Sequence, residues 1–333
     1  MKIPFPVREL DARGAVEYLA KRLGISRNEV QTTDLGGGVS NHVVLVETPD
    51  ARFVLKQSLP KLRVREDWFS DRSRIFREAE ALRVLAPDLP PGSVPEVLFE
   101  DRAEYAFAMS AAPATARTWK SELMNGTVSV AIARSVGNMH AALIASSWES
   151  EPMRANFGDQ TAFDQLRLDP YYRFTARTHP DIAQRFEAAV DRCRSQAKCL
   201  VHGDWSPKNL LVWNSNVMAI DFEVIHFGDP AFDVAFLLNH LVLKSVYRPQ
   251  STSGYRAAAL AYSEAITAQV PQWAWIQEGT LLHLPLLMLA RVDGKSPAEY
   301  IQETALVERV REFARSLISN PPSSVAAVFD RLA

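Results

Sequence analysis

Residues 200–223 of the chain read LVHGDWSPKNLLVWNSNVMAIDFE, and this stretch decides how the rest of the sequence is interpreted. Two aspartates, a histidine, an asparagine and a lysine interrupt apolar, strand-like sequence in which a plain buried strand would carry none of them. Asp204 and Asn209 are five residues apart in a segment typical of a loop. Asp221 follows the apolar run 217–220, which is typical of the return strand of a hairpin. We expect such a hairpin to bring its two ends together.

These polar residues are suited to a magnesium site beside a catalytic base. Asn209 and Asp221 offer the hard oxygen ligands that Mg²⁺ takes together with water and substrate phosphates. Asp204 is then left to accept a hydroxyl proton. Each residue also has an ordinary interpretation: His202 as a hydrogen-bonded core histidine, Asp204 as a turn former, Asn209 as a cap and Asp221 as a strand end. That alternative needs four coincidences of type and spacing, so we favour the functional one.

The composition is that of a folded protein that acts on a small partner. With 333 residues, 47% of them hydrophobic and 23% charged, two domains and a sizeable core are expected. Lys and Arg total 37 against 39 Asp and Glu, without long blocks of one sign, which favours neither nucleic-acid nor membrane binding. The N-terminus lacks a signal-peptide pattern, and Cys193 and Cys199 match no metal or redox motif. We therefore predict a cytoplasmic protein with reduced thiols, and the sequence indicates no oligomeric state.

The character of the sequence changes near residue 110. Before it, one helical stretch is surrounded by short apolar runs of strand type at 43–46, 53–55 and 105–109. Beyond it, long helical patterns cover 128–143, 181–197, 230–243, 254–267 and 275–290. We predict an α+β fold in two lobes: 1–110, a small nucleotide-binding lobe with an antiparallel sheet and one helix, and 111–333, a larger, mostly helical lobe for catalysis and acceptor binding. Pro285 should kink or split the last helix.

A glycine-rich segment, DLGGGVSN at 34–41, precedes the first strand-like run. Consecutive glycines let the backbone turn tightly and bring its N–H groups close to phosphate oxygens. Gly37, Gly38 and Ser40 are therefore candidate phosphate contacts. A glycine triplet in a hairpin is more often only a turn, so this pattern alone does not decide between the two.

A lysine and a glutamate in the first 110 residues could form a phosphate-binding pair. Lys56 ends the run 53–55, and about twenty residues later an amphipathic helix begins with Ile75, Ala79 and Leu82 on one stripe and Glu78 at its border. A lysine held by a helix glutamate can direct its point charge at α- and β-phosphates. The alternative is a solvated lysine and a surface glutamate.

A further aspartate lies just after the segment quoted first. Gly228-Asp229-Pro230 begins a helix, and Asp233 falls on its first turn, where a carboxylate is favoured by the helix dipole. Asp233 could be only a helix-start charge. We favour a supporting role in which its carboxylate accepts hydrogen bonds from backbone N–H groups of the His202 loop.

Together these motifs resemble the aminoglycoside phosphotransferase and choline kinase group, small-molecule kinases with a protein-kinase-like fold. The resemblance runs from about Asp34 to Asp233 and is strongest at 202–204 with Asn209, then at 220–223 and 228–230. It implies that Asp204 is the catalytic base, that Asn209 and Asp221 bind Mg²⁺, and that Lys56 pairs with Glu78 to hold the ATP phosphates.

The same resemblance implies an adenine site at the joint between the lobes. Residues 109–112, Met-Ser-Ala-Ala, match the interlobe linker, so that the Ser110 carbonyl and the Ala112 N–H would read the adenine edge while Met109 lines its pocket. The chain also departs from protein kinases. Its glycine segment lacks their spacing, and Phe222-Glu223 stands where they have Phe-Gly, which disfavours protein substrates.

The sequence indicates the residues that bind the acceptor substrate less clearly. Arg291 resembles in position the arginines with which methylthioribose kinases of this group hold their sugar, and Glu223 is a second acceptor candidate. A solvated arginine at a helix end is the alternative for Arg291. Lys208 could touch a phosphate or face solvent. The nearby charges of both signs leave a sugar, polyol, amino alcohol or aminoglycoside-like acceptor open.

The resemblance implies an ATP-dependent phosphotransferase that moves the γ-phosphoryl group to a hydroxyl of a small molecule, with ATP and Mg²⁺ as its cofactors. The preference for ATP over GTP is not encoded in any motif that we identify. A nucleotide-binding pseudokinase or an adaptor that regulates a partner protein is the alternative function. Intact Lys56, Asp204, Asn209 and Asp221 argue against it, because a non-catalytic relative could lose any of them.

Overall fold

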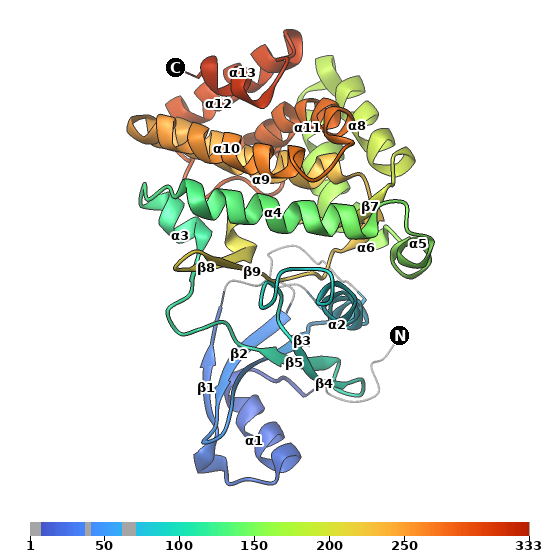
Figure 1. Ribbon diagram of the computed structural model, residues 1–333, viewed down its shortest axis with the longest axis vertical. Helices are drawn as coiled ribbons and strands as arrows, with labels where there is room; N and C mark the ends of the chain where they lie inside the picture. Colours follow the sequence, from blue (N-terminus) through green and yellow to red (C-terminus); the bar gives the residue numbers. More distant parts are fainter. Residues whose placement is uncertain (1–7, 37–40, 62–70, 333) are drawn as a thin grey trace. The chain divides into compact units, whose positions relative to one another are not determined.

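The computed structural model describes residues 8–36, 41–61 and 71–332, and the chain divides into two compact units. Unit 1 comprises Met1–Pro87 and Val94–Ala114, and unit 2 comprises Asp88–Ser93 and Thr115–Ala333. Figure 1 shows strands gathered in the first unit and long helices in the second. The assignment of nucleotide binding to 1–110 and of catalysis to 111–333 stays a prediction.

Unit 1 contains a five-stranded antiparallel sheet with the order β1-β2-β3-β5-β4. Its strands are β1 Gln31–Asp34, β2 Asn41–Glu47, β3 Arg52–Ser58, β4 Val97–Asp101 and β5 Ala106–Ser110. The apolar runs predicted as strands lie in β2, β3 and β5, so that prediction is confirmed. The central strand β3 is buried after its first residue, which places Lys56 inside the unit.

The described residues of unit 1 form two longer helices, although only one was predicted. The expected one is α2, Arg74–Leu85, which packs against β4 and β5 and buries the predicted stripe of Ile75, Ala79 and Leu82. The other is α1, Ala12–Leu23, which packs against β1 and begins where the Asp11 side chain accepts a hydrogen bond from the Gly14 N–H. The buried residues of α1 are Ala15, Tyr18, Leu19 and Ala20, and because two of these four are alanines, little large apolar sequence marks the helix. A short 3₁₀ helix, η1 Arg27–Glu29, follows.

Unit 2 is mostly helical. Its helices before residues 200–223 are α3 Trp119–Met124, α4 Val130–Ser147, α5 Glu151–Phe157, α6 Thr161–Phe163, η2 Asp164–Arg173, α7 Phe174–Thr178, η3 Pro180–Ile182 and α8 Ala183–Ser195. Beyond that segment lie α9 Pro230–Tyr247, η5 Pro249–Ser251, α10 Thr252–Thr267, α11 Trp273–Asp293, α12 Thr304–Ser319 and α13 Val325–Asp330. Across the described ranges, no helix combines the length and the apolar content that a membrane crossing requires.

The long helices agree with the sequence patterns except at one proline. Each of the five predicted helical stretches falls on a helix: α4, α8, α9, α10 and α11. Helix α11 continues from Trp273 to Asp293 with Pro285 inside it, so Pro285 does not split the helix, and the kink that was predicted as the other possibility stays a prediction. Packing against α9 and α12 holds α11 along its length, which outweighs the lost backbone hydrogen bond.

Residues 200–223 lie largely in two small sheets and the turns between their strands. Strand β7, Cys199–Val201, pairs with β10, His226–Gly228, and β8, Leu210–Trp213, forms a hairpin with β9, Asn216–Ala219. Strand β6, Arg117–Thr118, extends the hairpin, and the 3₁₀ turn η4, Pro207–Asn209, leads into it. Helix α9 is buried over most of its length, with α10, α11 and β7 packed against it. These contacts give the segment a rigid support.

Candidate active site

The hairpin brings the predicted polar residues of unit 2 together. Asn209 ends η4 just before β8, and Asp221 lies two residues after β9. The Ile220 N–H donates a hydrogen bond of 3.0 Å to the Asn209 carbonyl, and the Asn209 side-chain amide donates one of 3.0 Å to the Asp204 carbonyl. Asp221 is near enough to Asp204 that its charge acts to raise the pKa of the Asp204 carboxyl. The expected closure of the hairpin is confirmed.

Asp204 is a buried carboxylate that is held by two cations. Arg167 Nη2 lies 2.9 Å and Lys208 Nζ 2.8 Å from the same oxygen, Oδ2. Burial acts to raise the pKa of this carboxyl, but the two positive charges outweigh it and hold the pKa below its usual value. The other oxygen, Oδ1, has a 3.5 Å contact from the Ser206 hydroxyl. Asp204 is therefore ionised at neutral pH and has an oxygen available for a further donor.

His202 connects the Asp204 loop to the end of β9. Its Nε2 lies 3.0 Å from the Ile220 carbonyl, and its Nδ1 accepts a hydrogen bond of 3.2 Å from the Asp204 N–H. Burial lowers the pKa of His202 to about 4, so the ring is neutral and carries its proton on Nε2. The interpretation of His202 as a hydrogen-bonded core histidine is confirmed, and its bonds fix the backbone on both sides of the site.

Asp233 lies beneath the same loop, as predicted. Its carboxylate accepts hydrogen bonds from the N–H groups of His202 at 2.6 Å and Gly203 at 3.0 Å. Gly203 has φ +77°, and a Cβ there would lie 3.0 Å from the Val224 carbonyl oxygen, so the position requires glycine. The loop is thus anchored to the first turn of α9 by two hydrogen bonds and a backbone turn that excludes other residues.

The donors at Asn209 and Asp221 are compatible with a magnesium ion. Asn209 is 5% exposed, and because its amide nitrogen donates to Asp204, its amide oxygen is available as a ligand. Asp221 has φ +70°, a left-handed conformation that aspartate tolerates better than most residues. No group of three His, Cys, Asp or Glu side chains in the described ranges could hold a metal by itself. An ion here would therefore need non-protein ligands, as Mg²⁺ commonly does.

In unit 1, Lys56 and Glu78 form the predicted pair. Lys56 Nζ on β3 lies 2.6 Å from Glu78 Oε2 on α2, and both side chains are almost fully buried, at 4% and 1% exposed. The alternative of a solvated lysine and a surface glutamate is therefore wrong. An ion pair this deep is expensive to desolvate, so it is weak evidence for stability and is more readily explained by function.

The other candidates of unit 1 are only partly described. Gly37, Gly38 and Ser40 lie outside the described residues. Met109 is buried near the end of β5, and Ser110 closes that strand. The Ala112 carbonyl accepts a hydrogen bond of 2.5 Å from Arg52 Nη1. Their roles in adenine binding stay predictions.

The acceptor candidates of unit 2 lie in different settings. Arg291 on α11 is only 8% exposed, and its Nη1 donates to the Tyr171 hydroxyl at 3.2 Å, so the solvated helix-end interpretation is wrong. Glu223 is also buried, and its charge helps to raise the pKa of Arg167. Lys208 is half-exposed, but its ammonium contacts Asp204 rather than pointing only to solvent.

Arg167 is a further residue of the site that no sequence motif indicated. This residue lies on the π-helix η2, and besides its ion pair with Asp204 its Nε donates a hydrogen bond of 2.7 Å to the Gly203 carbonyl. Coulomb attraction from Asp204 outweighs burial and raises the pKa of Arg167. No motif spacing connects a residue 37 positions upstream with Asp204. A π-helix is rare and often marks a functional site, but it becomes visible only in three dimensions.

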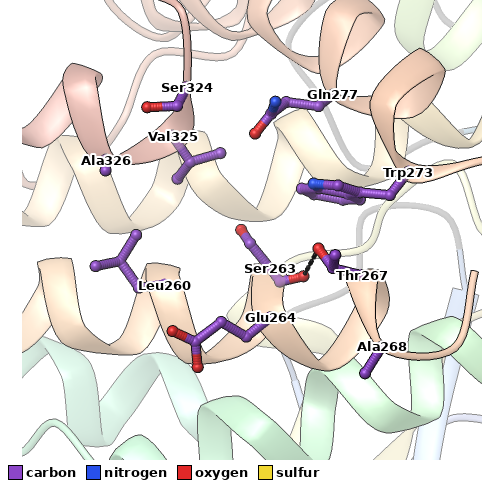
Figure 2. Close-up of a pocket in the computed structure, with 10 residues that line it drawn as sticks. All are labelled: Leu260, Ser263, Glu264, Thr267, Ala268, Trp273, Gln277, Ser324, Val325 and Ala326. Carbon is purple, nitrogen blue, oxygen red and sulfur yellow. Dashed lines mark hydrogen bonds between the residues drawn. The ribbon is translucent and has the colours of Figure 1, made fainter.

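A cavity elsewhere in unit 2 contains none of the predicted site residues. It has a volume of about 360 Å³ and is lined mainly by apolar and small side chains of α10, α11 and α13, among them Leu260, Trp273 and Val325 (Figure 2). Its lining includes one carboxylate, Glu264, and no basic side chain. It therefore lacks the basic side chains that would bind the phosphates in phosphoryl transfer.

The sequence of the chain matches a family model and is similar to the sequences of known enzymes. A family model described as the phosphotransferase enzyme family matches residues 31–262. The chain is 30% identical over 284 residues to methylthioribose kinase of Pectobacterium carotovorum, an alignment that covers 76% of this chain and 70% of that enzyme. It is 26% identical to methylthioribose kinase 2 of rice, Oryza sativa, over 71% of this chain and 63% of the relative.

Solved structures resemble the chain over nearly its whole length. An amicoumacin kinase in complex with AMP-PNP, Ca²⁺ and its ligand matches with a TM-score of 0.57 and 14% identity, covering 95% of this chain and 97% of the other. Choline kinase from Cryptosporidium parvum matches with a TM-score of 0.55 and 11% identity, covering 97% and 99%. At such identities the likeness concerns the fold, and it confirms the predicted α+β, protein-kinase-like fold.

Proposed function

Because this chain belongs to the phosphotransferase enzyme family, we propose that Asp204 is the base with which it transfers the γ-phosphoryl group of ATP to a hydroxyl group. The chain is a small-molecule kinase, as are its methylthioribose kinase relatives. One observation carries the assignment of the base. Asp204 is buried yet kept ionised by Arg167 and Lys208 on one oxygen, while the other oxygen has only a 3.5 Å contact.

Lys56 is the proposed contact for the α- and β-phosphates of ATP. Its ammonium is the kind of point charge that offsets phosphate charge, and Glu78 fixes its position at 2.6 Å. The family resemblance assigns the same role to this pair. Gly37, Gly38 and Ser40 are proposed as backbone phosphate contacts, and Met109, Ser110 and Ala112 as the adenine site.

Asn209 and Asp221 are the proposed ligands of Mg²⁺. When bound, Mg²⁺ neutralises phosphate charge and orients the triphosphate. The protein's own contribution is to hold the two oxygen donors at the two ends of one hairpin. His202 supports this arrangement because it links the Asp204 N–H to the Ile220 carbonyl beside Asp221.

The proposed reaction needs little covalent work from the protein. The acceptor oxygen forms a bond to the γ-phosphorus while the bond from that phosphorus to the β,γ-bridging oxygen breaks, and ADP leaves. The acceptor proton passes to Asp204. Because such transition states are loose, catalysis rests on positioning the two reactants and on neutralising charge. Asp233 and Gly203 serve this purpose by holding the loop that carries Asp204.

A screen of ATP consumption with Mg²⁺ tests this function directly. The panel contains methylthioribose, other sugars, polyols, hydroxy acids, amino alcohols and aminoglycosides, and at least one alcohol should stimulate ADP release and yield its phosphate ester. We expect Asp204→Ala to lower turnover of that acceptor by roughly 10²- to 10⁴-fold, the usual contribution of a positioned base, while ATP binding is largely kept.

Asp330→Ala is the matched control, because it removes a carboxylate that pairs with Arg256 at the surface. It should turn over at the parent rate. If Asp204→Ala did the same, the assignment of the base would be wrong. If the protein bound ATP and a partner but consumed no ATP with any alcohol, the pseudokinase or adaptor function would take its place.

We also propose a cytoplasmic location. The reaction depends on a supply of ATP, and both cysteines, Cys193 and Cys199, are buried free thiols. Free thiols are usual in proteins of reducing compartments. Labelled protein that co-fractionates with a secreted or periplasmic marker would contradict this location.

A further inference from the structure

Lys244 is a buried cation on α9 that lacks an acidic partner. It is 1% exposed, and its Nζ lies 3.4 Å from the His240 carbonyl of its own helix and 5.0 Å from the centre of the Tyr300 ring. Among the described residues, no carboxylate forms an ion pair with it. Lysines are rarely buried this deeply unless they are paired, because a desolvated charge is costly. When Lys244 is protonated, no acidic side chain of the described residues therefore pairs with its charge.

The neighbours of Lys244 do not supply the missing negative charge. Burial first, and then the charges of Lys120 and Arg291, lower the pKa of Lys244 to about 7, against an opposing contribution from Glu299. Glu299 itself forms an ion pair with Lys120. Burial and the cations around it, Lys244 first among them, also lower the pKa of His240, which leaves that ring neutral. The surroundings of Lys244 are thus positive on balance.

Two further polar groups near Lys244 also lack partners. Arg291 uses Nη1 for Tyr171 and for Ser296, but its Nε is buried and has no hydrogen-bond partner among the described residues. The buried hydroxyl of Tyr300 likewise has no partner there. Buried donors without acceptors are uncommon in folded proteins and point to an absent ligand. The Lys244 ammonium and the Arg291 Nε–H can only donate, and the Tyr300 hydroxyl can donate as well, so together they fit a ligand that accepts hydrogen bonds.

A continuous series of contacts connects this cluster with Asp204. Arg167, which contacts Asp204, lies one turn before Tyr171 on η2, and Tyr171 accepts a hydrogen bond from Arg291. The Tyr171 ring also packs on Phe236, whose ring packs on His240. His240 follows Asp233 by seven residues on α9, which corresponds to roughly 10 Å along the helix axis. Asp233 anchors the loop that carries Asp204. This length suits a compact metabolite.

We propose that the acceptor carries an anionic group, a carboxylate or a phosphate, which Lys244 and Arg291 bind while Asp204 takes up its hydroxyl. This inference rests on the proposed function and names the substrate class of the same site. An anion would neutralise Lys244 and accept hydrogen bonds from Arg291 Nε and the Tyr300 hydroxyl, whereas a neutral sugar would leave the lysine without a counter-charge. A polycationic aminoglycoside or a quaternary amine would meet repulsion here.

Matched acceptors and one lysine variant test the proposal. Glycerol is compared with glycerate and glycerol 3-phosphate, and 1,4-butanediol with 4-hydroxybutyrate, so that each comparison changes the anionic group. We expect a kcat/KM at least about tenfold higher for the anionic member. Lys244→Met should abolish that preference by raising KM, and Lys244→Arg should retain most of it. Lys198→Met is the control, because Lys198 is a partly exposed lysine paired with Glu149.

The outcomes separate this inference from the proposed function. Equal or better turnover of the neutral alcohols, or an unchanged preference in Lys244→Met, would overturn the anion site and leave the kinase intact. Full activity of Asp204→Ala would overturn the base and leave the anion site intact. The carboxylate and phosphate arms show which anion is preferred.

A binding measurement decides the case in which no alcohol of the panel is phosphorylated. Succinate and inorganic phosphate are added separately to protein saturated with Mg²⁺ and AMP-PNP, which occupies the nucleotide site. At least one anion should raise Tm by about 2 °C or more in the parent and in Lys198→Met but not in Lys244→Met. The absence of any rise in the parent would refute the proposal.

Discussion

Lys56 on β3 and Lys244 on α9 are both almost fully buried, but their surroundings differ. Lys56 Nζ lies 2.6 Å from a carboxylate oxygen of Glu78. Within the described residues, Lys244 Nζ has a backbone carbonyl at 3.4 Å and an aromatic ring at 5.0 Å, and no carboxylate pairs with it. The fold itself supplies a counter-charge to the first lysine, whereas the second depends on one that comes with a ligand.

The difference reflects what each lysine binds. ATP is the same in every reaction of this type, so a lysine for its phosphates can be held permanently by a glutamate that sets its position. The acceptor differs between enzymes, and a lysine that recognises its charge has to be left unneutralised so that the acceptor can neutralise it. In this view, the free energy lost by burying Lys244 is regained on binding.

The largest effect is expected at the paired lysine. Lys56→Met leaves the buried Glu78 carboxylate without the lysine that neutralises it, and removal of one partner of a buried pair typically destabilises a protein by about 3–5 kcal/mol. Urea unfolding measured by circular dichroism should therefore show a much lower midpoint. Activity should be lost as well, because Lys56 is the proposed phosphate contact.

The double variant Lys56→Met/Glu78→Leu separates the two consequences. With both charges removed, stability should recover substantially, since apolar replacement of a buried pair is often neutral, while activity stays lost. A single variant with the parent midpoint would show that Glu78 does not depend on Lys56 for its neutralisation.

The sequence predicted the first lysine but not the second, and the reason is local. Lys56 stands at the end of an apolar strand run, and Glu78 lies on the border of an amphipathic stripe, so pattern and family resemblance agree. Lys244 follows fourteen helix residues, most of them apolar, and a single lysine there is typical of an exposed helix position. Only the packing of α10, α11 and the segment after α11 around α9 places it inside.

The other residues of the site also divide into those that a local sequence pattern indicates and those that only tertiary packing places there. Asp204, Asn209 and Asp221 were found because one hairpin fixes their spacing in sequence. Arg167 was not found, because its contact with Asp204 depends on how η2 packs against a loop 37 residues later. The strands and long helices followed from periodicity, whereas α1 was not predicted, because two of the four residues that it buries are alanines.

A second, smaller effect of opposite sign is expected at the unpaired lysine. Lys244→Met removes a buried charge that has no acidic partner and keeps a side chain of similar length, so we expect the unliganded protein to become more stable by roughly 1–3 kcal/mol, the usual cost of a buried group that is left unsatisfied. Differential scanning calorimetry should show a higher Tm. The surface variant Lys198→Met should change stability by less than about 0.5 kcal/mol.

The stability that Lys244→Met gains over the parent should decrease as pH rises. The pKa of Lys244 is lowered from 10.5 to about 7, so between these values the folded protein binds fewer protons than the unfolded chain and its stability rises with pH. The penalty of the buried charge is therefore complete below about pH 7 and disappears towards pH 10.5. The advantage of Lys244→Met should shrink over that range, and a lower Tm than the parent at pH 6 would contradict the absence of a counter-charge.

The smallest effect is expected in the pH dependence of acceptor binding. Because burial lowers the pKa of Lys244 to about 7, the ammonium of the free enzyme loses its proton as pH rises through that value, and an anionic acceptor should then bind more weakly. The charged or titratable groups that face Lys244 are Lys120 of α3, His240 of α9, Arg291 of α11, and Glu299 and Tyr300 of the following segment. Burial lowers the pKa of His240 and raises that of Tyr300, so neither changes charge near pH 7.

The measured quantity is the ratio of kcat/KM for an anionic acceptor to that for its neutral partner between pH 6 and pH 8.5. Taking the ratio cancels groups that act on both acceptors, such as Asp233, whose pKa is raised by burial to about 7. The ratio should fall by up to about tenfold per pH unit above pH 7. Lys244→Arg should give a flatter profile, because a guanidinium keeps its charge over this range. A ratio that rises with pH in the parent would mean that the acceptor's charge is recognised by some other group.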